Sequence, residues 1–148
     1  QQDIVVQAFI PGYEVEVPVV IGKQRFAIAP MGVYYRDLEP LGTGILDYEG
    51  RKAHTYHFAD FHQVSAAIAE QLEQCAVETA ASLGIQGLGR IDFRVTETDS
   101  IPYITDIATN PGIHRNTSIY QGFEDLGYTY QDMMTILVGL TISRYGLT

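Results

Sequence analysis

The sequence contains no tryptophan, a single cysteine and only 9 basic residues among 148. Because Cys75 has no second cysteine to pair with in the chain, the sequence is typical of a reducing cytoplasm. The 18 acidic residues bring the formal charge to −9, which disfavours nucleic acid and anionic membranes as partners. No apolar run reaches the length of a membrane-spanning helix. The acidity does not argue against a nucleotide, because metal ions offset the phosphate charge locally.

What the chain does have is enough apolar sequence for one folded domain. The hydrophobic share is 46% and the charged share only 18%, which excludes a disordered segment. A length of 148 residues fits a single domain with a real core. The chain begins at Gln1 rather than Met and enters a strand-like run almost at once, so we expect a piece of a longer polypeptide.

Three strands are predicted at the start of the chain. Residues 3–10 are β-branched and apolar, and a Pro-Gly turn signal follows them. Residues 14–20 alternate valine with polar residues, which is the period of a half-buried strand. Pro18 cannot donate to a ladder and favours an edge strand or a bulge. Residues 25–29 return after a turn, so the first thirty residues predict an antiparallel meander.

The middle of the chain predicts a loop and then a helix. Residues 30–59 have no sustained period, and so long a loop inside a compact domain usually carries function. Asp60 followed by Gln63 resembles a capping box, so we expect a helix from there to Leu83. An apolar stripe at helical spacing supports it, formed by Val64, Ile68, Leu72, Cys75, Ala76, Ala80 and Leu83.

The next stretch predicts a β-hairpin that brings two aspartates together. Residues 87–95 and 102–108 each have the pattern of a strand, and residues 97–100 between them are polar enough for a turn. If the strands pair through that turn, Asp92 and Asp106 lie near each other. Two facing carboxylates repel, so one interpretation is a divalent-cation site beside an arginine. The other is a pair of solvated aspartates on the wet face of the hairpin.

Alternation predicts which residues of the hairpin share a face. One face of the first strand carries Ile91, Phe93 and Val95, and the other carries Arg90, Asp92 and Arg94. One face of the second strand carries Tyr103, Thr105 and Ile107, and the other carries Ile104, Asp106 and Ala108.

The last third of the chain predicts a polar loop and two helices. Residues 113–118 are loop-like, and their backbone amides, with Arg115, could meet an anionic group. A short helix is expected over residues 119–126, and Thr129 then caps a final helix whose methionines face the core. Strands dominate the first part and helices flank the hairpin, which predicts an α+β fold, an antiparallel β-sheet with flanking helices.

Four segments, in this order, resemble the carboxy-terminal part of the D-alanine–D-alanine ligase family of ATP-grasp enzymes. Residues 9–17 look like that family's strand-turn-strand at the adenine pocket, and residues 47–52 like its substrate-side loop. Residues 89–93 match its Gly-Arg-Val/Ile-Asp strand, and residues 106–112 look like its Glu-x-Asn-Thr-x-Pro-Gly segment. The resemblance implies that residues 1–148 are one lobe of an ATP-grasp fold from a longer parent chain.

The resemblance also implies binding of ATP with Mg²⁺ or Mn²⁺. A hinge would bind the adenine edge through its backbone groups. This hinge consists of Gln7, Ala8, Phe9 and Ile10. Glu14 would hold the ribose hydroxyls. Asp92 and Asp106 would hold the metal ions that bridge the ATP phosphates, since hard cations prefer carboxylate and phosphate oxygens.

For the chemistry, the resemblance implies that ATP drives the joining of a carboxylate to an amine through an acyl phosphate. Arg90 and the amide of Gly112 would stabilise the oxyanions, and Arg51 stands where the family has a loop lysine. Thr117 or Ser118 would contact the substrate carboxylate. In the family this reaction serves cell wall biosynthesis in the cytoplasm, often in homodimers, with amino-terminal and central domains that these residues do not include.

Three departures from the family pattern keep alternatives open. Asp106 stands where glutamate is usual, Ala108 stands where the family has asparagine, and Arg51 replaces lysine. The preferred interpretation is a D-alanine–D-alanine ligase-like enzyme. The first alternative is an ATP-grasp ligase for another amino-acid pair. The second is a degenerate lobe that acts as a non-catalytic binding or structural module.

Overall fold

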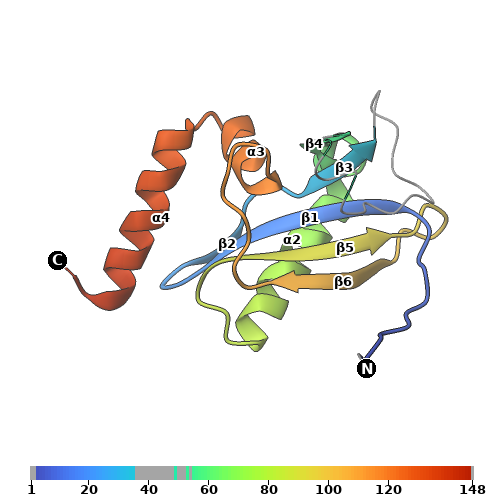
Figure 1. Cartoon of the computed structure of the whole chain (residues 1–148), viewed down its shortest axis with the longest axis horizontal. Coiled ribbons are helices and arrows are strands. Elements are labelled where there is room, and N and C mark those ends of the chain that lie inside the picture. Colours follow the sequence, from blue (N-terminus) through green and yellow to red (C-terminus); the bar gives the residue numbers. More distant parts are fainter. Residues whose placement is uncertain (1–2, 36–48, 50–52, 54, 148) are drawn as a thin grey trace.

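The computed structural model describes residues 3–35, 49, 53 and 55–147 of the chain. In this described part the strands form one antiparallel sheet with helices on both faces, which confirms the α+β prediction (Figure 1). The order across the sheet is β4 (Tyr56–Asp60), β3 (Met31–Tyr35), β1 (Tyr13–Ile21), β5 (Gly87–Val95) and β6 (Pro102–Ala108). The short β2 (Arg25–Ala27) also pairs with β1.

The helices divide between the two faces of the sheet. Helix α2 (Ala66–Ser82) covers one face and buries Val15, Val17 and Val19 of β1 and Ile91, Phe93 and Val95 of β5 in the main core. Helices α3 (Ser118–Asp125) and α4 (Tyr130–Tyr145) build a second, smaller core on the other face, around Val20 and Met133. No helix in the described part of the chain is long and apolar enough to cross a membrane.

Helix α2 begins six residues after the predicted start at Asp60, because two different caps act in this region. The Asp60 carboxylate accepts a hydrogen bond from the His62 amide and caps a 3-10 turn, Phe61–Gln63. Ser65 is the N-cap of α2 itself and accepts from the Ile68 amide. The buried stripe consists of small residues and one leucine, Ala69, Leu72, Ala76 and Ala80, and these bring the helix close to the sheet.

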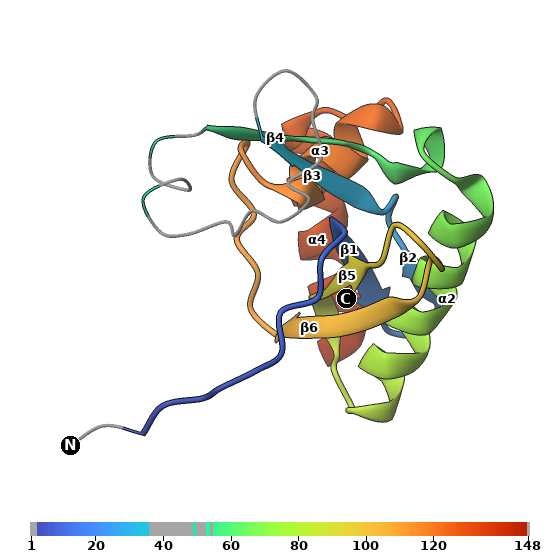
Figure 2. The ribbon, with the colours of Figure 1, turned by 90° about the vertical axis from the view of Figure 1, so that its right-hand side faces the viewer.

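The strand predicted over residues 3–10 does not form. Residues 3–9 are exposed, and this segment leads away from the body of the molecule (Figure 2). The first paired residue is Tyr13, and β1 already has β5 on one side and β2 and β3 on the other. The β-branched residues at the start of the chain therefore have no open side of β1 to pair with.

The loop predicted over residues 30–59 begins and ends with strands. Strands β3 and β4 pair from Met31 opposite Asp60 to Tyr35 opposite Tyr56. The pattern of β3 shows no alternation because four of its five residues are buried, as in a strand covered on both faces. Residues 36–48, 50–52 and 54 lie outside the described part of the chain.

Pro18 does not mark an edge, because β1 lies inside the sheet. The carbonyl of Pro18 accepts a hydrogen bond from the Ile28 amide, so the same side of Pro18 faces the segment between β2 and β3. Along β1, Pro18 stands between Val19, which pairs with β2, and Glu16, which pairs with β3. The missing N–H of proline thus falls where β1 changes partner.

Candidate functional site

The predicted hairpin forms, and its register places carboxylates in one row. Strand β5 pairs with β6 so that Asp92 lies opposite Asp106. On its other side β5 pairs with β1, where Glu16 lies opposite Asp92. Residues directly opposite each other share a face of the sheet. Since Val17 and Ile91, at alternate positions, pack under α2, the three carboxylates lie on the other face.

A β-bulge at Thr105 corrects the faces predicted for the second strand. The register shifts between Asp92 and Phe93, so that Phe93 lies opposite Ile104 and Thr105 is the extra residue. The Thr105 hydroxyl donates to the backbone carbonyl of Asp92 at 3.2 Å. Strict alternation, which places Ile104 and Asp106 on one face, is therefore wrong for this strand.

Arg90 lies between the carboxylates of two strands. Its Nε donates to Oδ1 of Asp92 at 2.7 Å, and its Nη2 donates to Oδ2 of the same residue at 2.6 Å. Its Nη1 lies 3.1 Å from Oε2 of Glu16. Glu16 and Asp92 are 2% and 6% exposed, so the ion pairs are shielded from water. The two aspartates are therefore not a solvated pair, since Asp92 is buried and bound by a planar guanidinium.

The surroundings of Arg90 keep it charged. Burial by itself lowers the pKa of the guanidinium, but the hydrogen bond to Asp92 and the charges of Glu16, Asp92 and Asp106 raise it. The net effect is a pKa above the usual arginine value. Arg90 is thus a permanent cation that can face developing negative charge without changing its protonation state.

The two predicted substrate residues have different neighbours. The Ser118 hydroxyl donates to Oε2 of Glu16 at 2.5 Å, and Ser118 is fully buried. Thr117 is the N-cap of α3, where its hydroxyl accepts from the Tyr120 amide and donates to the His114 carbonyl. Ser118 therefore fixes Glu16 from the start of α3, while Thr117 borders a cavity.

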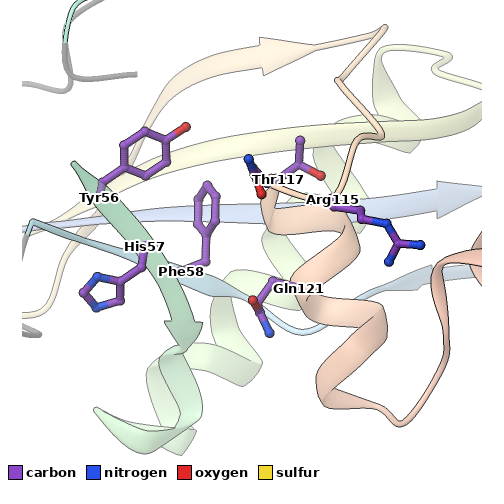
Figure 3. A pocket seen from close by; sticks show the side chains of 7 residues that line it. Tyr56, His57, Phe58, Arg115, Thr117 and Gln121 are labelled. Carbon is purple, nitrogen blue, oxygen red and sulfur yellow. The ribbon is translucent and has the colours of Figure 1, made fainter. Parts of the chain in front are cut away.

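This cavity lies between β4 and the start of α3 and has a volume of about 210 Å³ (Figure 3). Tyr56 and Phe58 point from β4 toward Thr117, whereas His57 points to the other side of the strand. The full lining consists of Tyr56, His57, Phe58, Arg115, Asn116, Thr117 and Gln121. The Arg115 guanidinium lies over the ring of Tyr130 at 4.5 Å, so it stacks against α4.

Arg94 organises the segment predicted to bind adenine and ribose. Its Nε donates to the carbonyl of Ile10 at 2.9 Å, and its Nη1 lies 3.3 Å from Oε2 of Glu14. Its guanidinium lies over the ring of Phe9 at 4.9 Å. Gln7, Ala8 and Phe9 are exposed, Ile10 is half-buried, and all four lie outside any strand, so Arg94 helps to tie this hinge to the sheet.

The chemistry of Asp92 and Asp106 fits Mg²⁺, provided that Arg90 releases Asp92. Carboxylate oxygens are the hard ligands that this ion prefers, and it usually keeps phosphate and water as further ligands. Within the described residues, no group of three or more histidine, cysteine, aspartate or glutamate side chains could hold a metal ion. Ala108 lies opposite Arg90 and adds no ligand. The metal role of the two aspartates stays a prediction.

Two further predicted residues have a less informative setting. Gly112 lies between β6 and α3, and a Cβ there would make only ordinary contacts with His114 and Thr117 at 3.5–3.6 Å. Any requirement for glycine would therefore come from a ligand rather than from the fold. Arg51 and residues 47–48 and 50–52 of the substrate-side loop lie outside the described part of the chain.

Glu16 is a residue of the site that the sequence pattern did not predict. The alternation of β1 assigns Glu14 and Glu16 to the same polar face, which is usually the solvated one. The structure buries Glu16 between Arg90 and Ser118. One signal was available, because residues 15–21 are almost continuously apolar, as in a strand buried on both faces.

Comparison with protein families decides what this fold and these residues belong to. The family described as "D-ala D-ala ligase C-terminus" matches residues 1–139. The chain belongs to this family. The membership confirms the resemblance seen in the four sequence segments.

The relatives with curated names support the same conclusion. A D-alanine–D-alanine ligase of Janthinobacterium is 28% identical over 157 aligned positions, which cover 97% of this chain and 43% of that protein. A D-alanine–D-alanine ligase of Levilactobacillus brevis is 32% identical over 84 positions, which cover 56% of this chain and 22% of that protein. The chain thus spans less than half the length of these curated relatives.

Solved structures confirm the ATP-grasp lobe at the level of fold. The D-alanine–D-alanine ligase of Bacillus anthracis complexed with ATP matches with a TM-score of 0.69 at 15% identity, over 95% of this chain and 42% of that one. The D-alanine–D-alanine ligase of Coxiella burnetii matches with a TM-score of 0.66 at 23% identity, over 93% of this chain and 33% of that one. The VanG D-Ala:D-Ser ligase of Enterococcus faecalis matches with a TM-score of 0.64 at 18% identity, over 89% and 37%.

Proposed function

We propose that this chain is the carboxy-terminal ATP-grasp lobe of an ATP-dependent carboxylate–amine ligase that resembles D-alanine–D-alanine ligase. The observation that carries the proposal is the position of Arg90. A permanently charged guanidinium lies between Glu16 and Asp92, beside Asp106, on the sheet face that α2 leaves uncovered. Buried ion pairs usually add little net stability, so the presence of this one supports a functional role.

The nucleotide would bind along β1 and the hinge before it. The backbone of Gln7, Ala8, Phe9 and Ile10 would bind the adenine edge, and Glu14 the ribose hydroxyls. Arg94 supports this assignment because it holds both Glu14 and the Ile10 carbonyl. The Bacillus anthracis neighbour was solved with ATP, which makes ATP the nucleotide to test.

Arg90 and Gly112 would act on the reacting groups. The guanidinium would stabilise negative charge on the acyl phosphate and on the tetrahedral stage, and the Gly112 amide would donate a hydrogen bond to the same oxyanion. Asp92 and Asp106 would hold Mg²⁺ or Mn²⁺, which supplies charge neutralisation at the ATP phosphates. Arg51 would contribute a second cation from the substrate-side loop.

Of the two substrate candidates, Thr117 is the stronger. Thr117 lines the cavity of about 210 Å³ between β4 and α3, which is large enough for a small amino acid. Ser118 is buried against Glu16 and would act through it. We propose D-alanine as the first substrate to test. The fold does not decide the second amino acid, because one neighbour is named a D-Ala:D-Ser ligase.

The decisive test uses a protein of the relatives' full length that carries this chain. Phosphate release from ATP with D-alanine is expected, and Asp92→Ala should abolish it while the circular dichroism spectrum stays unchanged. Asp99→Ala is the matched control, since Asp99 is an exposed aspartate in the turn of the same hairpin. Near-normal phosphate release by folded Asp92→Ala would contradict the proposal. Release with other amino-acid pairs and none with D-alanine would favour a ligase for another pair.

The 148-residue chain alone is expected to bind ATP weakly. An ATP-grasp site is a cleft between two lobes, and this chain is proposed to supply one of them. Titration calorimetry with ATP in the presence of Mg²⁺ should therefore show little or no binding of ATP beyond the signal of Mg²⁺ alone. A dissociation constant in the micromolar range would contradict this expectation. A cytoplasmic location and a homodimeric parent also remain predictions.

A second candidate is a degenerate lobe that acts as a binding or structural module. Ala108 favours it, because no side-chain ligand stands opposite Arg90 on β6. The closed contact between Arg90 and Asp92 favours it as well. A rise in melting temperature with ATP that requires Mg²⁺, measured on the full-length protein, would argue against this candidate. No change in a folded protein would support it.

A further inference from the structure

Asp92 has two roles that compete with each other. In the proposed function it holds a divalent cation, yet in the structure both of its oxygens accept hydrogen bonds from Arg90 at 2.6–2.7 Å. The paired guanidinium contacts both oxygens of the carboxylate, and a second cation beside it would be repelled. Binding of a metal ion at Asp92 therefore favours release of Arg90 from this carboxylate.

A cation released from Asp92 in this setting needs another partner. The Arg90 side chain is 12% exposed, so an unpaired guanidinium would lose much of its hydration. One carboxylate is already within reach, since Oε2 of Glu16 lies 3.1 Å from Nη1. Asp106, on the far side of Asp92, is exposed and is itself the second predicted metal ligand.

Glu16 is held in place independently of Arg90. The Ser118 hydroxyl at the start of α3 donates to Glu16 at 2.5 Å, and Glu16 is 2% exposed in the central strand of the sheet. Its position is thus set by β1 and α3, neither of which needs to move when Arg90 changes partner. Because Glu16 is fixed and lies next to Asp92, the Arg90 guanidinium can leave Asp92 and still be paired with a carboxylate.

We propose that Glu16 is the positioning residue that retains Arg90 when Asp92 turns from the guanidinium to a divalent cation. The inference rests on the proposed function and goes beyond it, since it assigns a role to a residue outside the predicted site. In the metal-free state Arg90 neutralises both carboxylates. In the metal-bound state it stays paired with Glu16 and remains directed at the reacting groups. Glu16 would thus couple metal binding to the position of the catalytic cation.

The test follows Mg²⁺ binding by nuclear magnetic resonance on the 148-residue chain. Mg²⁺ should shift the amide signals of Asp92 and Asp106, and it should shift the Arg90 Nε–Hε signal with the same dissociation constant. Glu16→Gln should weaken Mg²⁺ binding by at least about tenfold, since Arg90 would have no second carboxylate. In that variant the Arg90 signal should stay at its metal-free position.

The matched control is Glu14→Gln, which removes the same charge from the same face of β1 two residues away. Glu14 contacts Arg94 rather than Arg90, so only a general loss of negative charge is expected, about twofold to threefold in the dissociation constant. Equal weakening by the two variants would overturn the role of Glu16.

The Arg90 and aspartate signals distinguish failure of the partner exchange from failure of the metal site. If Mg²⁺ shifts Asp92 and Asp106 but leaves the Arg90 signal of the unmodified chain unchanged, the exchange is wrong and the metal site stands. If Mg²⁺ shifts neither aspartate, the metal site and the exchange both fail.

Ser118→Ala keeps the test decisive if Glu16→Gln does not fold. This variant leaves every charge in place and removes only the hydroxyl that fixes Glu16. Mg²⁺ binding should weaken by about threefold, which corresponds to the loss of one ordinary hydrogen bond. Unchanged binding by Ser118→Ala would overturn the proposal that a fixed Glu16 supports the exchange.

Discussion

The two faces of β1 and β5 are both largely buried, but one face is apolar and the other is charged. Under α2 the strands present Val15, Val17, Ile91 and Phe93, each 0% exposed. On the other face the same strands present Glu14, Glu16, Arg90, Asp92 and Arg94, joined by ion pairs. The apolar face contributes about 1.5–3 kcal/mol per large side chain. A buried ion-pair network contributes little net stability, because desolvation offsets the attraction. The comparison indicates that one face makes the fold stable and the other serves the site.

The largest expected effect is the loss of a ring on the apolar face. Phe93→Ala should lower the free energy of unfolding by about 3–5 kcal/mol, since it leaves a cavity in a fully buried place under α2. Urea denaturation measures the change. Phe26→Ala makes the same replacement on β2, where the ring is 41% exposed, and should cost much less. Equal losses would show that the face under α2 is not the main core.

On the charged face, removing one partner should be almost as harmful. Arg90→Met leaves Glu16 and Asp92 buried without their shared cation and should lower the free energy of unfolding by about 3 kcal/mol. Arg25→Met, at an exposed position on β2, is the control for loss of a positive charge. An Arg90→Met protein as stable as the unchanged chain would mean that the network is not energetically coupled.

Removing the whole network should have a much smaller effect on stability. Combining Arg90→Met with Glu16→Leu and Asp92→Leu should bring the free energy of unfolding back to within about 1 kcal/mol of the unchanged chain. The combined variant of the full-length protein should nevertheless show no ATP-dependent phosphate release. A combined variant less stable than Arg90→Met alone would show that this face cannot be repacked with apolar side chains.

The smallest expected effect on stability belongs to an exposed carboxylate, Asp132. The pKa of Asp132 is lowered from its ordinary value of 3.8 by hydrogen bonds from the Thr129 hydroxyl and the Thr129 amide in the capping box of α4. A lowered folded pKa stabilises the native state above pH 3.8, and this stability is lost as the pH falls through the folded pKa. Asp132→Asn should flatten the acid side of the stability curve followed by circular dichroism. Asp125→Asn is the control for the change in net charge, and an unchanged acid limb in Asp132→Asn would contradict the role of the cap.

Local signals explain which parts of the fold were predictable. The hairpin of β5 and β6 has both strands and its turn in one stretch of sequence, and its register places Asp92 opposite Asp106 as expected. The final helix begins at the predicted cap, Thr129. In each case the residues that specify the element lie within a few positions of one another.

Long-range pairing explains what was not predictable. Strands β3 and β4 are separated by some twenty residues, and β3 is buried on both faces, so it shows no alternation. Residues 3–10 have strand composition without a partner strand. The bulge at Thr105 is a property of the pair of strands, because it appears only when two registers are compared.

The sequence by itself determined the apolar faces and the family. Alternating valines in β1 and alternating apolar residues in β5 specify a face that must be buried, whatever covers it. Four segments in order were sufficient to recognise the ligase lobe, and the match over residues 1–139 confirmed it. Only the tertiary structure decided that the charged face is buried and which of its residues pair. Glu16, Arg90 and Ser118 come from three separate elements, and no periodicity within any one of them reveals that they meet.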